Sequence, residues 1–199
     1  ASALAEEDIQ LLSWDHPMVR GTLDILTTEP HGSSSVALLP NKALPAGSYL
    51  LELNFIVEAS APAQLQLSRY LPATPLRVLL DKNANNLAGK VSFEQLSKQL
   101  KPVGRQTGSK LAGALQTLLH PLLGKANALA EAELALLVQQ AQQKAAATLS
   151  EQYQRLAALR KQNPAVRQDE LDALQHKQQQ LAQYIAKARV KLDAIRLIV

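Results

Sequence analysis

The spacing of apolar residues changes near Phe93 and divides the chain into two differently patterned parts. Before Phe93, short apolar runs are separated by Pro, Gly, Asn and Ser, a pattern typical of strands and turns. After it, Ala, Leu, Gln and Lys recur with helical spacing, and few Pro or Gly residues interrupt them. The sequence therefore predicts an α+β fold, in which an antiparallel sheet is followed by long helices.

The N-terminal part of the chain is predicted to be helical. The apolar spacing predicts a helix over residues 4–28, in which Asp15 is a good N-cap and Pro17 lies in the first turn, where a missing N–H costs little. Residues 30–35 are predicted to be a flexible connection, because their sequence PHGSSS offers no surface for packing.

Four or five strands with short polar connections are predicted next. In the strand over residues 49–58, the apolar side chains fall on one side and polar ones fall on the other, as expected of a half-buried strand. The apolar set is Leu51, Leu53, Phe55 and Val57, and the polar set includes Glu52, Asn54 and Glu58. The other strands are predicted over residues 64–71, 76–80 and 87–93. The connections favour an antiparallel meander, because parallel neighbours need a crossover of about a dozen residues or more.

Helices are predicted from residue 94 onward. One covers residues 94–119 with a break near residues 102–104, and a long one covers residues 125–161. Asn163 and Pro164 supply an N-cap and a first-turn proline for a second long helix. Its core positions are spaced by three and four residues, as in a coiled-coil seam: Leu171, Leu174, Gln178, Leu181, Ile185, Ala188 and Leu192. So short a turn predicts an antiparallel helical hairpin.

The last residues, 194–199, are apolar and rich in β-branched side chains. They are predicted to return to the sheet as a strand, and the alternative is a frayed helix end. The expected organisation is an N-terminal helical segment over residues 1–33, a β-sheet module over residues 34–100 plus 192–199, and a helical region over residues 101–191. The hairpin of that region is predicted to turn near residues 162–168.

Composition places the chain among ordinary globular proteins, because 47% of its 199 residues are apolar. The absence of cysteine excludes disulfides and cysteine-ligated metals, and it fits a reducing compartment. The chain starts ASALAEED, acidic where a signal peptide would be basic, and no apolar run is long enough to span a bilayer. We expect a cytoplasmic protein with no membrane partner. Because the chain does not begin with Met, we expect it to be a fragment of a longer one.

Charge is distributed unevenly along the chain. Residues 1–93 carry 6 basic and 9 acidic side chains, whereas residues 94–199 carry 15 basic and 8 acidic ones. A basic half of this kind indicates an anionic partner, such as a nucleic acid or an acidic protein surface, although a solvated helix surface also accounts for such charge.

Residues 104–110, GRQTGSK, resemble a phosphate-binding loop only superficially. A Walker A loop has four residues between its glycines and places Lys directly after the second, whereas three residues intervene here and Ser109 precedes Lys110. We therefore expect no ATP site and no bound cofactor. The segment is predicted to be a helix-initiating turn, which could place Arg105 and Lys110 beside an anionic partner.

No other motif points to catalysis or to a metal. Residues 81–86, DKNANN, imitate the start of a calcium loop, but Asn86 and Ser92 stand where the loop needs Gly and a bidentate Glu, so a hairpin turn is predicted. The histidines are scattered without metal-ligand spacing: His16, His31, His120 and His176. The sequence predicts no catalytic residue and no metal ligand.

Four cations gather around the predicted hairpin turn: Arg155, Arg160, Lys161 and Arg167. A solvated helix end accounts for them, since cations complement the helix dipole there. As contact residues they would bind backbone phosphate or an acidic protein surface. Base stacking is not expected, because Tyr153 is the one aromatic residue nearby in the sequence.

Several segments together resemble the C-terminal region of the RapA family, which are bacterial Swi/Snf-type ATPases. They are DHPMVR at residues 15–20, ALLPNKALPAG at residues 37–47, LDKNANNL at residues 80–87, TGSK at residues 107–110 and LDAIRLIV at residues 192–199. The resemblance covers essentially the whole chain in order. It implies membership of an ATP-dependent, helicase-like, DNA-binding motor that associates with core RNA polymerase in the bacterial cytoplasm and nucleoid and promotes polymerase recycling in transcription.

By this resemblance, ATP and Mg²⁺ would bind in motor domains of the longer protein, and this segment would be an accessory and docking part without chemistry of its own. It would contact the motor domains and the polymerase, and DNA or RNA is a further candidate partner. Two alternatives stay open from the residues. One is a structural module that only sets geometry within its own chain. The other is a weak nucleic-acid-binding domain that acts through the basic C-terminal half.

Overall fold

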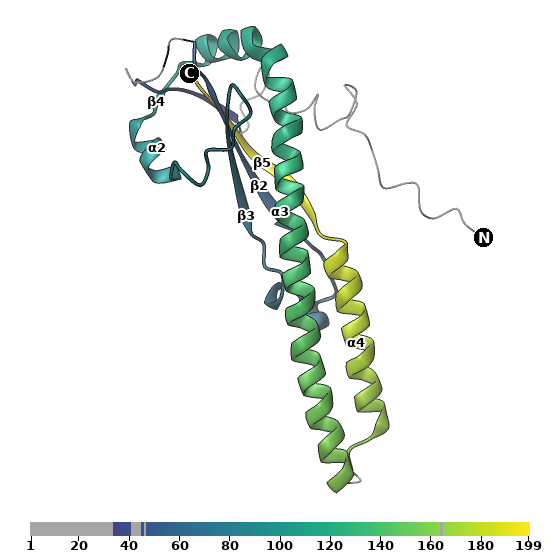
Figure 1. Cartoon of the computed structure of the whole chain (residues 1–199). Helices are drawn as coiled ribbons and strands as arrows, with labels where there is room; N and C mark the ends of the chain where they lie inside the picture. Colours follow the sequence, from purple (N-terminus) through teal and green to yellow (C-terminus); the bar gives the residue numbers. More distant parts are fainter. Residues whose placement is uncertain (1–33, 41–44, 46, 164) are drawn as a thin grey trace, which may run out of the picture. The chain divides into compact units, whose positions relative to one another are not determined.

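The computed structural model describes residues 34–40, 45, 47–163 and 165–199, so the predicted N-terminal helix over residues 4–28 lies outside the described residues. The strands are β1 (Ser34–Leu38), β2 (Leu50–Glu58), β3 (Pro75–Asp81), β4 (Lys101–Pro102) and β5 (Arg189–Ile198). The helices are η1 (Ala63–Leu65), η2 (Leu67–Arg69), α2 (Phe93–Gln99), α3 (Arg105–Gln162) and α4 (Gln168–Ala186) (Figure 1). This is the predicted α+β class, with a mostly antiparallel sheet and a long helical hairpin.

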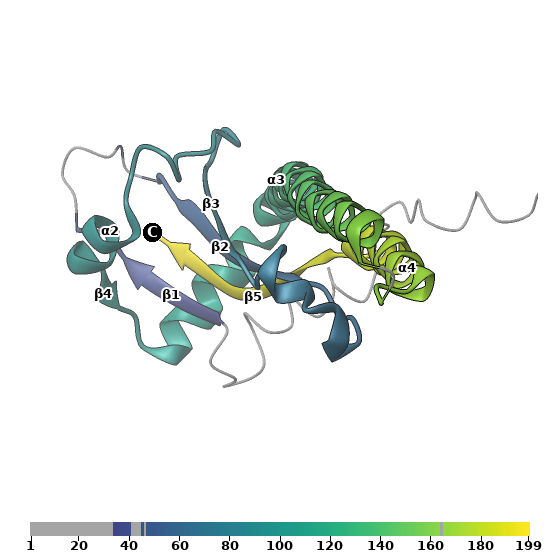
Figure 2. The ribbon, with the colours of Figure 1, turned by 90° about the horizontal axis from the view of Figure 1, so that it is seen from below.

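The sheet has five strands in the order β3-β2-β5-β1-β4. The C-terminal strand was predicted and is confirmed, but it lies between β2 and β1 (Figure 2) and pairs in parallel with β1, so that Val36 faces Leu197 and Ala37 faces Ile198. A meander cannot have this order, because the last strand occupies the centre. β1 itself includes Ser34 and Ser35, which were predicted to be part of a flexible connection.

Strand β2 buries the four predicted apolar side chains, Leu51, Leu53, Phe55 and Val57. Its other side is not exposed throughout as predicted, because Glu52 is fully buried. The cause is α2, which packs on that side of the sheet through Leu96 together with Leu79 and Ile198. A strand that is covered on both sides no longer follows a simple alternation of burial.

Two of the predicted strands are wrong. Residues 64–71 contain the short 3-10 helices η1 and η2, joined by Gln66 with φ of 51°. This left-handed backbone interrupts any extended chain. Residues 87–93 form a turn, and α2 begins at Phe93, where the Ser92 hydroxyl accepts a hydrogen bond from the Gln95 amide at 3.2 Å. Such a cap fixes the start of a helix.

Helix α3 is longer than the pattern predicted. The break near residues 102–104 is confirmed, since β4 separates α2 from α3, but the predicted end near Leu119 is wrong. The helix continues through Pro121, although a proline inside a helix removes one hydrogen bond and favours a bend. Leu119 and Leu122 are almost fully buried on either side of it, so packing holds the helix where local propensity does not.

The described residues divide into two compact units, one within residues 34–54, 77–128 and 193–199, and the other within residues 55–76 and 129–192. In the first unit, α2 covers one face of the sheet. The start of α3 covers the other, because a Cβ at Gly108 would lie 3.3 Å from the Cβ of Val36, on the face that Val36 shares with Leu197. Glycine is therefore the residue that lets α3 approach β1 closely.

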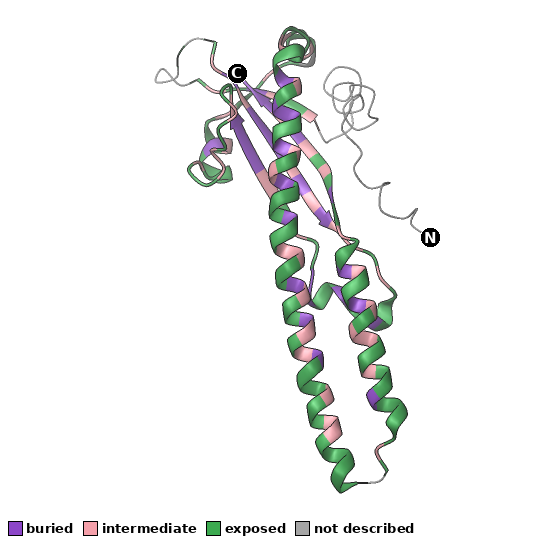
Figure 3. Ribbon diagram, turned by 45° about the vertical axis from the view of Figure 1, so that its right-hand side comes forward, coloured by how far each residue is buried: buried purple, intermediate pink, exposed green. Residues whose placement is uncertain are grey.

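The second unit contains the hairpin of α3 and α4. Buried positions recur along both helices (Figure 3), and on α3 they include Leu134, Ala141, Ala145 and Leu149. Of the predicted seam, Leu171, Leu181 and Ile185 are buried, whereas Leu174 and Gln178 are half-buried. The predicted seam positions Ala188 and Leu192 lie beyond α4, which ends at Ala186 before β5 begins at Arg189. Asn163 does not cap α4 as predicted. Its amide continues α3 by donating to the Leu159 carbonyl, and its side-chain oxygen accepts from the Ala165 amide at 3.0 Å, so Arg167 takes the N-cap position.

Candidate functional site

The four candidate cations at the hairpin turn are all exposed: Arg155, Arg160, Lys161 and Arg167. Two of them have partners on α4. Arg160 donates a hydrogen bond to the Gln168 side chain, and Arg167 forms an ion pair with Asp169 at 3.2 Å. Both side chains of that ion pair are more than 70% exposed, so the pair contributes little to stability.

Acidic residues balance this cationic cluster. Residues 151–172 carry four basic side chains and four acidic ones, the latter being Glu151, Asp169, Glu170 and Asp172. The hairpin turn therefore has no net charge, and its attraction for a distant anion is weak. The sequence shows the cations as a cluster. In the structure, the connection between α3 and α4 places the acidic first turn of α4 next to Arg167.

The candidate residues Arg105 and Lys110 lie in the first two turns of α3. Lys110 is exposed, and the segment from Gly104 is the helix-initiating turn that the spacing predicted, with the Gly108 amide donating to the Gly104 carbonyl at 2.9 Å. The strand before it, β4, is two exposed residues long. A phosphate-binding loop instead follows a buried strand, and its glycine stays open to the ligand, whereas Gly108 packs on Val36.

Lys110 belongs to a longer cationic run that sequence reasoning did not single out. Residues 82–125 carry seven Lys or Arg side chains and one acidic residue, Glu94. Three of these lysines, Lys98, Lys101 and Lys110, are exposed in successive elements, the last turn of α2, the edge strand β4 and the start of α3. A charge count over shorter windows would have found this run.

In the turn after β3, the side-chain oxygen atoms of Asp81 accept hydrogen bonds from residues of the same turn. The Asp81 carboxylate accepts from the amides of Asn83 and Asn85 at 2.8 and 2.9 Å and from the Asn85 side chain. Burial raises the pKa of the Asp81 carboxyl, but these hydrogen bonds outweigh it, so that the pKa lies below the usual value. Ala84, with φ of 61°, completes a tight turn. The predicted turn is thus present, but only an isolated antiparallel bridge between Leu80 and Asn86 follows it instead of the predicted second strand.

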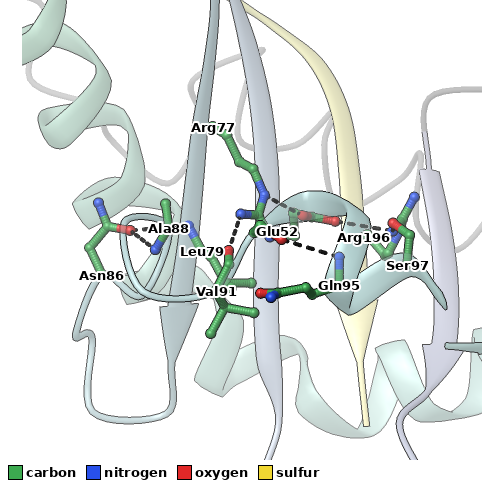
Figure 4. Close-up of polar contacts among 10 residues, drawn as sticks. Glu52, Arg77, Leu79, Asn86, Ala88, Val91, Gln95, Ser97 and Arg196 are labelled. Atoms are coloured by element: carbon green, nitrogen blue, oxygen red, sulfur yellow. Dashed lines mark hydrogen bonds and ion pairs between the residues drawn. The ribbon is translucent and has the colours of Figure 1, made fainter. Parts of the chain in front are cut away.

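The first unit contains a buried network around Glu52 (Figure 4). Its carboxylate lies 2.6 Å from Nε of Arg77 on β3 and 3.3 Å from Nη1 of Arg196 on β5. Arg77 also donates to the Val91 carbonyl, and Arg196 donates to the Ser97 hydroxyl of α2 at 3.3 Å. Three strands and α2 are thereby connected through one carboxylate.

Phe93 covers this network from α2. The guanidinium carbons of Arg77 and Arg196 lie 5.8 and 5.4 Å from the centre of its ring, within the range of cation–π attraction. Phe93 is 45% exposed, and the two arginine side chains are only 17% and 26% exposed. The geometry is that of a structural clamp for α2. No group in it is placed to act as a nucleophile with an adjacent base.

The remaining chemistry-bearing residues do not converge. Among the described residues, no three His, Asp or Glu side chains lie close enough to hold a metal ion. His120 is half-buried within α3 and His176 is exposed on α4, whereas His16 and His31 lie outside the described residues. None of the helices in the described parts of the chain is long and apolar enough to cross a membrane.

A sequence model of the RNA polymerase recycling family, C-terminal (RapA_C), matches residues 1–199. The chain belongs to this family. It is 49% identical over 197 residues to the RNA polymerase-associated protein RapA of Cronobacter sakazakii and 50% identical over 198 residues to that of Klebsiella pneumoniae. Each match covers 99% of this chain and 20% of the relative, so the chain spans about a fifth of the length of these RapA proteins.

RapA_C membership agrees with the resemblance inferred from the residue segments. The match extends through the whole chain and therefore includes the cationic run, the Glu52 network and the helical hairpin. Of these, neither the cationic run nor the Glu52 network was found by sequence reasoning. The one available signal of the network was an acidic residue inside an otherwise apolar strand.

Proposed function

We propose that this chain is an accessory docking region of an RNA polymerase-associated, ATP-dependent motor, and that it binds core RNA polymerase without catalysing a reaction itself. The observation that carries the proposal is the match of the RNA polymerase recycling family to the entire chain. The names of the relatives state an association with RNA polymerase. ATP and Mg²⁺ would bind in motor domains of the longer protein, which also contact this region.

The cationic run supports a docking role for the first unit. Lys98, Lys101 and Lys110 are exposed and lie within thirteen residues of one another, and Figure 2 shows α2 and β4 beside each other at the β1 edge of the sheet. Because Glu94 is the one acidic residue among residues 82–125, this run of the chain favours an acidic protein partner. The neutral hairpin turn is a weaker candidate for the same contact.

The proposal is tested by a pull-down with core RNA polymerase. The triple variant Lys98→Glu/Lys101→Glu/Lys110→Glu should lose most of the binding, and Arg160→Glu/Lys161→Glu/Arg167→Glu at the hairpin turn should retain it. Loss confined to the second variant would move the docking surface to the hairpin. Failure of the unsubstituted chain to bind would contradict the proposal.

A second function is favoured by the charge balance of the hairpin. Since residues 151–172 have no net charge, the hairpin is suited to set spacing within the longer protein. Shortening both arms by two helical turns would then change the coupling to the motor domains while binding to the polymerase stays unchanged.

A further inference from the structure

The second unit contains a cleft of about 580 Å³ that no motif predicted. Val57, Glu58, Ala59 and Ser60 form one side, and Ser68, Leu71 and Ala73 come from the η2 region. Lys187 is the C-cap residue of α4, and Arg189 is the first residue of β5. Its volume lies in the range of ligand sites. The cleft therefore combines two cations, two hydroxyl groups and one carboxylate over a floor of small apolar residues.

The carboxylate does not neutralise the cations. Glu58 lies 3.8 Å from Nη2 of Arg189 and 3.4 Å from Nζ of Lys191, which follows on the same face of β5. The side chains of these two cations are still 78% and 66% exposed. Arg189 and Lys191 thus share one carboxylate, and Lys187 lines the same cleft, so the cleft lining of two cations and one carboxylate carries a net positive charge.

Two further cations lie next to a residue that lines the cleft. Lys144 on α3 donates to the carbonyl of Arg69, the residue after Ser68, at 3.2 Å, and this contact places Lys144 beside η2. Arg69 itself is exposed. The cleft lining therefore carries a net positive charge, whereas the hairpin turn, which sequence reasoning selected, is neutral.

We propose that this cleft binds the phosphate backbone of a single-stranded nucleic acid. Closely spaced cations with hydroxyl donors suit a chain of phosphates, each of which offers several acceptor oxygens. Among the described residues that line the cleft none is aromatic, so the site would hold the backbone and would not stack bases. The inference does not depend on the polymerase contact, which uses residues of the other unit.

The test is fluorescence anisotropy of the 199-residue chain with labelled 20-nucleotide U and dT oligomers at several salt concentrations. Lys187→Gln/Arg189→Gln should weaken binding at least tenfold and reduce the slope of log K against log salt by about 1.4, since each phosphate contact on a single strand contributes about 0.7. Arg155→Gln/Arg160→Gln at the hairpin turn is the control and should bind like the unsubstituted chain. Thermal melting of each variant verifies its fold.

One substitution is expected to increase the affinity for the oligomers instead of lowering it. Glu58→Gln removes the carboxylate that competes for the cations, so it should tighten binding about two- to fivefold, a change that a purely structural role of these residues would not produce. Binding of both oligomers or of the RNA alone supports the proposal, and a preference for RNA would indicate contact with the 2′-hydroxyl.

Equal affinity of the parent and the Lys187→Gln/Arg189→Gln variant would overturn the inference. Displacement of the oligomers by polyglutamate at equal charge concentration would also overturn it, in favour of an acidic protein segment. A polymerase pull-down that is unchanged in this double variant separates the failure of this inference from the failure of the docking proposal.

Discussion

The guanidinium of Arg77 lies 2.6 Å from the carboxylate of Glu52, which is completely inaccessible to solvent. A buried carboxylate is costly unless it is paired, and here Arg196 supplies a second cation at 3.3 Å. Both arginines also contact the ring of Phe93, the first residue of α2. The position of α2 on the sheet therefore depends on this ionic network as well as on Leu96.

Replacement of Glu52 by Leu should destabilise the protein by about 3 kcal/mol, because two partly buried guanidinium groups would lose their counter-charge. Urea denaturation monitored by circular dichroism measures the change. In the triple variant Glu52→Leu/Arg77→Met/Arg196→Met, most of the stability should return. Glu94→Gln, at an exposed position of α2, is the control. A Glu52→Leu variant as stable as the parent would show that the network contributes nothing.

Phe55 is the large side chain at the centre of the apolar face of β2 and is only 2% exposed. Its replacement by Ala should lower the free energy of unfolding by about 3–5 kcal/mol, since the removed ring leaves a cavity. Leu159→Ala, at a position that is 48% exposed on α3, should cost far less. Equal melting temperatures for the parent and the Phe55→Ala variant would mean that this face of β2 is not packed.

Asp81 makes stability depend on pH. Its folded-state pKa is lowered, so its stabilising contribution is present above the unfolded-state pKa and is lost as the pH falls through the folded-state value. Asp81→Asn should therefore cost about 1 kcal/mol at pH 7 and almost nothing at pH 2. Urea titrations at both pH values measure this, with Asp193→Asn, at an exposed position, as the control. An equal cost at both pH values would refute the assigned role of the carboxylate.

The chain should not bind Mg-ATP, because Gly108, in the segment of residues 104–110 that resembles a phosphate-binding loop, packs on Val36 and leaves no room for a nucleotide there. Isothermal titration calorimetry should detect no heat of binding up to millimolar nucleotide. Micromolar binding that disappears in a Lys110→Ala variant would contradict this prediction and restore the segment as a nucleotide site.

Elements with a strong local period were predictable from the sequence. The two-residue alternation of β2 predicted its buried apolar face, and the three-four spacing of α4 predicted the buried positions Leu171, Leu181 and Ile185. The same spacing wrongly extended the helix to Leu192, which lies in β5. The C-terminal strand was also predictable, because β-branched residues follow directly after a helix. Its position in the sheet was not, since strand order depends on pairing between distant segments.

Other features depend on contacts that no local pattern contains. Leu65 and Leu67 are buried as the alternation requires, but short 3-10 turns bury them as well as a strand would. Glu52 is buried because Arg196 and α2, both far along the chain, close over it. In the candidate site, the charges could be counted from the sequence, but the pairing of Arg167 with Asp169 and the cleft beside Arg189 exist only in the folded chain.

The most direct test of the docking account is the equilibrium affinity of the 199-residue chain for immobilised core RNA polymerase, measured by biolayer interferometry at 50 and 200 mM salt. The account predicts saturable binding that weakens at the higher salt concentration, and at least a tenfold loss of affinity in the Lys98→Glu/Lys101→Glu/Lys110→Glu variant. No saturable binding at either salt concentration, from a chain whose circular dichroism shows it to be folded, would contradict the account.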